Sequence, residues 1–597
     1  MTTEEDAAAA KLAKMTDNLA KIEALSTRLM AALAQRKPSD PGVQGPGQDM
    51  YMKAAAAYLA GMMQNPAKVL EHQVSYWGKT MKHYVAAQQA LVQGGAAPDD
   101  PGPKDRRFAN PIWDTNPAFN YLKQQYLINA EAVQNAVGDL DEIDPNDKKR
   151  VEYFARQIVD MLSPTNFLGT NPDALEKAIA TDGESLVRGL ENLVADIEAN
   201  RGEFAVTLAD PAAFTVGENI ATTPGSVVFR NRMFELIQYK PVTETVHKTP
   251  LLIFPPWINK FYVMDMKASN SLIRWIVEQG FTLFVVSWVN PDASYADTGM
   301  DDYIREGFLT AMAEVRRITG EKQINAVGYC IAGTTLSLVL SHLHRAGDAS
   351  VKSATFFTTL TDFSDPGEVG VFLSDDFVDG IERQSRIDGM LSKTFMSRTF
   401  SYLRSNDLIY GPAIKSYMLG EAPPAFDLLF WNGDGTNLPC KMAMEYLRGL
   451  CRADGLAKGT FEVFGKPVSM ADIQIPVCAI ACETDHIAHW KGSFNGFRQM
   501  GSKDKTFILS QSGHIAGIIN PPSKGKYGHY SSDAAVAGDP RDWLAGAAFT
   551  QGSWWPRWGA WLAERSGPQV KARIPGDSGH PVLGPAPGSY VVAKPTL

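Results

Sequence analysis

Six short apolar runs in the second half of the chain place the strongest constraint on its fold. The runs are PLLIFPP (250–256), FTLFVVSW (281–288), INAVGYC (324–330), SATFFTTL (353–360), IPVCAIAC (475–482) and KTFILSQ (505–511). Continuous apolar runs of this length suit strands that are buried on both faces. Because helical stretches separate the runs, the pattern predicts a mostly parallel sheet that helices cover on both sides. We therefore expect an α/β domain over residues 205–597.

The alternation of strands and helices lapses between about residues 362 and 460. This stretch is rich in Asp, Phe, Gly and Pro and carries helical signals. Since the runs on either side belong to one sheet, the stretch is predicted to be an insertion that caps it.

The first part of the chain has a helical character instead. Between Leu12 and Leu33 apolar residues recur at spacings of three and four, which predicts an amphipathic helix within residues 1–37. A Pro- and Gly-rich stretch predicts a linker at 38–50. The helix either pairs, lies on an apolar surface or is a loose appendage, and the pattern leaves all three open.

Residues 51–204 contain few strand signals and several helix signals. In TNPDALEKAI, for example, Asn171 suits the N-cap and Pro172 the first helical position. We expect a mainly helical N-terminal domain over this range.

Composition excludes several classes of protein. The net charge of −9 gives no general support for nucleic-acid binding. Five cysteines without regular spacing predict neither a disulfide framework nor a zinc site and fit a reducing cytoplasm. The sequence has no evident signal peptide, transmembrane run, metal motif or nucleotide-binding glycine motif, so we expect no membrane span, no metal and no cofactor.

The sequence GYCIAG at 328–333 carries the first chemical signal. It joins a predicted strand to a predicted helix through a turn bounded by Gly328 and Gly333. This is the context of a nucleophile elbow, in which a sharp turn presents the middle side chain, here Cys330, at the edge of the sheet. The dipole of the helix that follows favours the thiolate. The alternative is a buried structural cysteine at a tight turn.

Partners for Cys330 follow two later strands in the order nucleophile, acid, histidine, which is typical of α/β-hydrolases. Asp485 comes just after IPVCAIAC, and His514 follows KTFILSQ between small residues. We predict His514 as the general base and Asp485 as the residue that orients it. His486 is the rival base, and its alternative roles are packing or substrate contact.

Ten segments, three of which contain Cys330, Asp485 and His514, support a family resemblance. They are DRRFAN (105–110), SPTNFLGTNP (163–172), TPGSVVF (223–229), PPWINKFYVMDM (255–266), VSWVNPD (286–292), GYCIAGTTL (328–336), TTLTDFSDPG (358–367), WNGDGTNLP (431–439), TDHI (484–487) and SGHIAGIINPP (512–522). In this order they resemble polyhydroxyalkanoate synthases, most closely the single-subunit class I enzymes, over almost the whole chain after the first hundred residues. Many relatives carry two glycines where this chain has Ala332 and Gly333.

The resemblance implies that Cys330, Asp485 and His514 take the family's catalytic positions. The implied reaction joins (R)-3-hydroxyacyl units, first 3-hydroxybutyryl, from coenzyme A thioesters into a polyester through an acyl-cysteine. Coenzyme A would be released as part of the substrate rather than retained as a cofactor. The family also implies a homodimer at the surface of polyester granules in the cytoplasm, with residues 51–204 supporting granule association or dimerisation.

The oxyanion and substrate contacts can be placed only in outline. The N–H of Ile331, just after the nucleophile, and an amide of the PPWINK loop, for which we select Ile258, are the predicted oxyanion donors. Trp431 is predicted to line the site or to pack. The cap is predicted to exclude water.

Two other functions remain open on the sequence. A cysteine-dependent thioesterase or polyester depolymerase would use the same three residues with water as the acceptor. A granule-surface scaffold protein would use the N-terminal helices and need no nucleophile.

Overall fold

The computed structural model describes residues 2–36, 48–93, 105–140 and 144–593, which fold into two compact units. The first unit is helical and comprises residues up to Asp210 together with Arg398–Pro424. The second comprises Pro211–Ser397 and the residues from Ala425 onward. Most of the predicted linker at 38–50 lies outside the described residues, and a helix already begins at Gln48.

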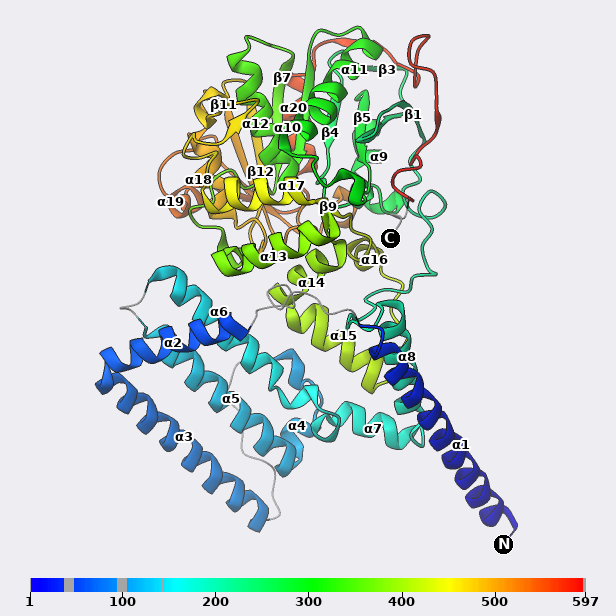
Figure 1. The fold of residues 1–597 in the computed structure, drawn as a ribbon, viewed down its shortest axis with the longest axis vertical. Helices are drawn as coiled ribbons and strands as arrows, with labels where there is room; N and C mark the ends of the chain where they lie inside the picture. The colour runs from blue at the N-terminus through cyan, green and yellow to red at the C-terminus, as the bar shows by residue number, and fades with distance from the viewer. Residues whose placement is uncertain (1, 37–47, 94–104, 141–143, 594–597) are drawn as a thin grey trace. The chain divides into compact units, whose positions relative to one another are not determined.

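The helical unit is built from eight α-helices in its N-terminal part, among the described residues (Figure 1). They are α1 (Thr2–Leu33), α2 (Gln48–Gln64), α3 (Pro66–Gln93), α4 (Ile112–Thr115), α5 (Pro117–Gly138), α6 (Pro145–Met161), α7 (Pro172–Ala180) and α8 (Glu184–Ala199). The predicted start of α7 is confirmed, because the Asn171 side chain accepts a hydrogen bond from the Ala174 N–H and Pro172 occupies the first turn. No helix of the described ranges is long and apolar enough to cross a membrane.

Helix α1 packs on α8 and so is not a loose appendage. Leu25 is buried against Val187 and Val194, and Arg28 pairs with Glu198 at 2.8 Å. The helix begins ten residues earlier than the periodicity indicates, because the segment before Leu12 is rich in alanine, which favours helix without marking an apolar face.

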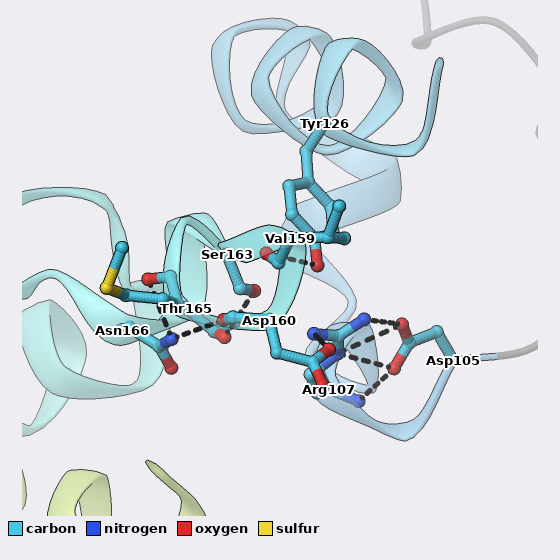
Figure 2. A network of polar contacts seen from close by, with 9 residues as sticks. Asp105, Arg107, Tyr126, Val159, Asp160, Ser163, Thr165 and Asn166 are labelled. Carbon is cyan, nitrogen blue, oxygen red and sulfur yellow. Dashed lines mark hydrogen bonds and ion pairs between the residues drawn. The ribbon is translucent and has the colours of Figure 1, made fainter. Parts of the chain in front are cut away.

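The DRRFAN segment forms a polar junction in the helical unit (Figure 2). The Arg107 guanidinium donates to both carboxylate oxygens of Asp105 and also to Asp160 at 3.1 Å, which ties the segment to the end of α6. The Tyr126 hydroxyl of α5 donates to the carbonyl of Val159. These bonds join α5 and α6 to the chain that precedes α4.

Residues 398–424 correct the predicted extent of the cap. They fall inside the expected insertion at 362–460 but belong to the helical unit. The Tyr417 hydroxyl donates to Asp196 of α8 at 2.6 Å, and Gln157 of α6 donates to the carbonyl of Tyr402. These contacts explain why the segment leaves the sheet-containing unit.

An eleven-stranded sheet forms the centre of the second unit, as far as the described residues show. Its order is β15 (Ala548–Thr550), β14 (His529–Ser531), β13 (Lys505–Ser510), β12 (Val477–Cys482), β7 (Val351–Phe357), β6 (Ile324–Tyr329), β4 (Leu251–Phe254), β5 (Leu283–Trp288), β2 (Phe234–Tyr239), β1 (Gly225–Arg230) and β17 (Gly584–Pro585). All six predicted runs are strands, and they form the parallel centre from β13 to β5. The outer strands pair antiparallel, so the sheet is parallel only at its centre.

Helices cover both faces of this sheet, as predicted (Figure 1). They are α9 (Leu272–Glu278), α11 (Thr310–Thr319), α12 (Ile331–Arg345), α18 (Trp490–Gln499), α19 (Pro540–Ala545) and α20 (Trp555–Glu564). Phe357 of β7 packs on Trp558 of α20, whereas its neighbour Phe356 packs on Phe497 of α18. Since successive strand residues point to opposite faces, α18 and α20 lie on opposite sides.

The rest of the expected cap belongs to the second unit. Its elements are α13 (Asp375–Asp388), the start of α14 (Lys393–Leu403), α16 (Asp427–Gly433), α17 (Cys440–Met444) and a two-stranded sheet of β8 (Met390–Leu391) and β9 (Leu438–Pro439). They lie in the chain between β7 and β12, in the position expected for an insertion.

Candidate active site

Cys330 lies at a strained turn between β6 and α12. Its φ of 55° and ψ of −124° are in a region that side chains other than glycine rarely adopt. The Cys330 N–H donates to the carbonyl of Phe357 at 2.7 Å, and the Thr359 hydroxyl donates to the Cys330 carbonyl at 3.2 Å. Neighbouring strand ends therefore hold the turn, and the half-buried thiol has the setting of a nucleophile elbow.

Two glycines make this turn possible. A Cβ on Gly328 would lie 2.5 Å from the Cα of Gly333, and a Cβ on Gly333 would lie 2.0 Å from Oγ1 of Thr359. The strand and the helix thus approach each other more closely than side chains allow. Ala332 is buried without conflict, so the departure from the two-glycine pattern is tolerated.

Asp485 and His514 meet at the ends of β12 and β13. The Nδ1 atom of His514 lies 2.7 Å from Oδ2 of Asp485. The other carboxylate oxygen of Asp485 accepts hydrogen bonds from the N–H groups of Ile487 and Ala488 at 2.8 and 2.9 Å. The Asp485 side chain is fully buried, so these bonds fix its orientation toward the imidazole.

The pKa of His514 is raised well above its ordinary value. Burial is the largest single influence and lowers this pKa, but the interactions with Asp485 and Cys330 together outweigh burial, and the charge of Asp485 is the strongest of them. Since the folded-state pKa exceeds the unfolded one, protonation of His514 stabilises the fold. The contribution of this protonation to the free energy of unfolding is complete below pH about 6.5, and it is lost as the pH rises through the folded-state pKa.

The loop after β4 lies beside the elbow. Phe254, the last residue of β4, pairs with Gly328 of β6, which places PPWINK next to the turn at Cys330. The Trp257 indole N–H donates to the Thr335 hydroxyl of α12 at 3.2 Å. Ile331 is the first residue of α12. The structure therefore brings the loop of Ile258 next to the helix that Ile331 begins, which is the arrangement that two oxyanion donors require.

Comparison with known proteins gives the family. Residues 104–276 match the family model described as the N-terminus of poly-beta-hydroxybutyrate polymerase, and residues 249–521 match that of the alpha/beta hydrolase fold. The chain is 39% identical to a poly(3-hydroxyalkanoate) polymerase of Methylorubrum extorquens, over 94% of this chain and 95% of the relative. It is 41% identical to a poly(3-hydroxyalkanoate) polymerase subunit of Cupriavidus necator, over 90% of each.

The chain belongs to the poly(3-hydroxyalkanoate) polymerase family. It is therefore an acyltransferase with an α/β-hydrolase fold, and both sequence-based predictions are confirmed. The predicted membership of the polyhydroxyalkanoate synthase family is likewise confirmed.

Two residues predicted to contact substrate have different surroundings in this polymerase. Trp431 is buried in the main apolar core, where its indole N–H donates to the carbonyl of Lys260 at 2.7 Å, which favours the packing role. His486 is half-buried next to Asp485. Because Asp485 bonds His514, the structure favours His514 over His486 as the base.

Two residues that support the polymerase site were not predicted from the sequence. Thr359 bonds the Cys330 carbonyl, and the Tyr329 hydroxyl donates to the His514 carbonyl at 3.3 Å. Tyr329 is adjacent to the nucleophile, which is a weak signal, whereas nothing in the pattern marks Thr359. Within the described parts of the chain, no three His, Cys, Asp or Glu side chains gather in a group that could hold a metal ion.

Replacing Gly333 by alanine should destabilise the polymerase by about 1–3 kcal/mol, because the new methyl group collides with Thr359. Chemical denaturation measures the effect. Gly433→Ala is the matched control, since a Cβ on Gly433 of α16 meets no atom within 4 Å. We expect the control to change the free energy of unfolding by less than about 1 kcal/mol. Equal effects of the two substitutions would contradict this account of the elbow.

Replacing Cys330 by alanine should lower the pKa of His514, because the substitution removes the charge and hydrogen bond of the thiol. NMR titration of isotope-labelled histidines measures the pKa, and a His514→Gln variant assigns the signal among the ten histidines. Cys440→Ala, at another half-buried free cysteine, should leave the signal unchanged. An unchanged pKa in Cys330→Ala would show that the two side chains do not interact.

Proposed function

We propose that the chain polymerises (R)-3-hydroxyacyl-coenzyme A, with 3-hydroxybutyryl-coenzyme A as the preferred monomer, through an acyl group carried by Cys330. The observation that supports this most directly is a cysteine at a nucleophile elbow, at the same edge of the sheet as the hydrogen-bonded pair of Asp485 and His514, in a member of the polymerase family. The preference for short monomers of three to five carbons rests on the class I resemblance.

Acylation is the first step. The Cys330 sulfur attacks the thioester carbonyl carbon, and the oxygen becomes negatively charged next to the N–H groups of Ile331 and Ile258. The carbon–sulfur bond to coenzyme A then breaks, and the leaving thiolate takes the proton that His514 holds. The products are an acyl-cysteine, free coenzyme A and a neutral imidazole.

Chain extension is the second step. The hydroxyl of another 3-hydroxyacyl group gives its proton to His514 and attacks the acyl-cysteine carbonyl, which forms an ester bond and releases the Cys330 thiolate. Asp485 holds Nδ1 of His514 at 2.7 Å and stabilises the imidazolium that results.

A cysteine suits this sequence better than a serine. Exchange of one thioester for another is nearly isoenergetic, so the acyl group keeps its reactivity until a hydroxyl arrives. Formation of the oxygen ester then runs downhill. A serine would lose this free energy at acylation, and its hydroxyl is a weaker nucleophile at neutral pH.

Water must be kept from the acyl-cysteine, since hydrolysis would end the chain. The parts of the insertion that belong to the second unit, 362–397 and 425–460, are the proposed cover. This assignment rests on their place in the chain between β7 and β12.

The reaction is tested by incubating the purified protein with 3-hydroxyacyl-coenzyme A of increasing acyl length. We expect one molecule of free coenzyme A for each monomer unit found in insoluble polyester. The rate should be highest for the four-carbon substrate. Soluble 3-hydroxybutyrate as the sole product would contradict the proposed polymerisation and indicate a thioesterase instead.

We also propose that the active form is a homodimer on the surface of cytoplasmic polyester granules. Apolar side chains of α3 that are about 60% exposed support an apolar contact: Leu70, Val74, Trp77 and Met81. Specific activity that falls on dilution would support the dimer, and a fully active monomer in light scattering would contradict it.

Replacing Val74 and Trp77 together by glutamine should weaken granule association at least about tenfold, because the exposed apolar area of α3 is reduced. Co-sedimentation of the purified protein with polyester granules measures it. Val242→Gln removes an equally exposed apolar side chain from the second unit and should leave binding intact. Equal retention of both variants on granules would contradict a role for α3.

A further inference from the structure

The segment 431–437 is bound along the loop that follows β4, although about 170 residues separate the two in sequence. The Thr436 N–H donates to the Ile258 carbonyl at 3.1 Å, and the Thr436 hydroxyl donates to the Trp257 carbonyl at 3.0 Å. Gly435 and Asn259 form an antiparallel bridge. Gly435 and Thr436 thus pair with three successive residues of the loop, 257–259.

Thr436 holds the peptide that joins Trp257 to Ile258. A trans peptide is planar, and its C=O and N–H point in opposite directions. The Thr436 hydroxyl donates a hydrogen bond to the C=O of this peptide. Because this bond fixes the direction of the C=O, it also determines the direction of the Ile258 N–H. That N–H is the proposed second oxyanion donor, and a buried Thr436 leaves its hydroxyl little freedom to turn elsewhere.

Asp434 anchors the same segment. Its carboxylate accepts from the Lys260 ammonium at 2.7 Å through one oxygen and from the Tyr262 hydroxyl at 2.8 Å through the other. The Lys260 side chain is only 8% exposed, so this ion pair is largely shielded from water. The Trp257 indole bond to Thr335 fixes the loop on its other side, to α12.

We propose that Thr436 is a positioning residue that directs the Ile258 N–H toward the acyl oxygen at Cys330, with Asp434 anchoring its segment. The proposal rests on the proposed acyl transfer through Cys330. It gives the insertion a supporting part in catalysis, because Thr436 lies between its α16 and α17. The role is to support an oxyanion donor, and Thr436 itself does not touch substrate.

The test compares two reactions of Cys330 in the full-length protein. Acylation by p-nitrophenyl butyrate forms an oxyanion, whereas alkylation by iodoacetamide forms none. Thr436→Val keeps the shape of the side chain but removes the hydroxyl. We expect the acylation rate of this variant to fall about 10- to 100-fold and its alkylation rate to stay within about twofold of the wild type.

Two control variants separate positioning from folding. Thr436→Ser keeps the hydroxyl and should restore most of the acylation rate. Thr319→Val removes a hydroxyl that donates to the carbonyl of Val315 in α11, and should leave both rates unchanged. An unchanged acylation rate in Thr436→Val, or equal losses of acylation and alkylation, would overturn the proposal. Wild-type protein that releases coenzyme A without making polymer would overturn the polymerase function while leaving this comparison valid.

Discussion

Replacing Cys330 by alanine is expected to reduce coenzyme A release and polymer formation by at least about 10⁴-fold, while the protein stays folded. The strained backbone at Cys330, with φ 55°, has no evident purpose in packing, since a residue with less strain would serve a purely structural turn. Removal of the sulfur leaves no nucleophile to receive the acyl group. Coenzyme A release is followed with a thiol reagent, and polymer is weighed or followed by turbidity.

Cys440→Ala is the matched control for this substitution. Cys440 is also free and half-buried in the second unit, and burial raises the pKa of its thiol. We expect this control to keep activity within about twofold of the wild type. Polymer formation that survives Cys330→Ala would favour the scaffold function, in which the nucleophile plays no part.

Replacing Asp485 by asparagine is expected to lower kcat by about 10²- to 10⁴-fold. The amide nearly preserves the volume and can still accept from Ile487 and Ala488, but it carries no charge to stabilise the His514 imidazolium. The pKa of His514 should fall in this variant, because the charge of Asp485 is the main cause that raises it. Steady-state kinetics over a range of pH values measures both effects.

Glu483→Gln is the control for the loss of a carboxylate in this region. Glu483 immediately follows β12, two residues before Asp485, and its backbone N–H donates to the carbonyl of Ser510. We expect normal kcat in the control. A kcat of Asp485→Asn within about tenfold of the wild type would mean that another group orients His514.

The centre of the fold could be predicted because burial on both faces leaves a continuous apolar run in the sequence. This held for each of the six central strands. The outer antiparallel strands carry no such run, because β15 is exposed at all three residues and the buried strand β2 is interrupted by the polar residues Glu235 and Gln238. The start of α1 at Thr2 lies within the predicted range 1–37, although the apolar periodicity begins only at Leu12, since alanines favour helix but do not mark a face.

The candidate site could be predicted as far as its residues follow strands. Cys330, Asp485 and His514 each come just after a strand of the parallel centre, and parallel strands bring their carboxyl ends to one edge. Residues 398–424 belong to the helical unit because of contacts such as that of Tyr417 with Asp196, which join segments more than 200 residues apart in the sequence. The hydrogen bond from Thr436 to the loop of Ile258 likewise joins residues far apart in the sequence. No local pattern of apolar residues records such contacts.

The formation of an acyl group on Cys330 is the central claim, and butyryl-coenzyme A tests it most directly. This substrate can acylate the cysteine but has no hydroxyl with which to extend a chain, so one acyl group should remain bound. After brief incubation and acid quenching, mass spectrometry of the peptides should find butyryl on the peptide that contains Cys330. Coenzyme A release in step with butyryl on a different residue, on Cys440 for example, would contradict the account.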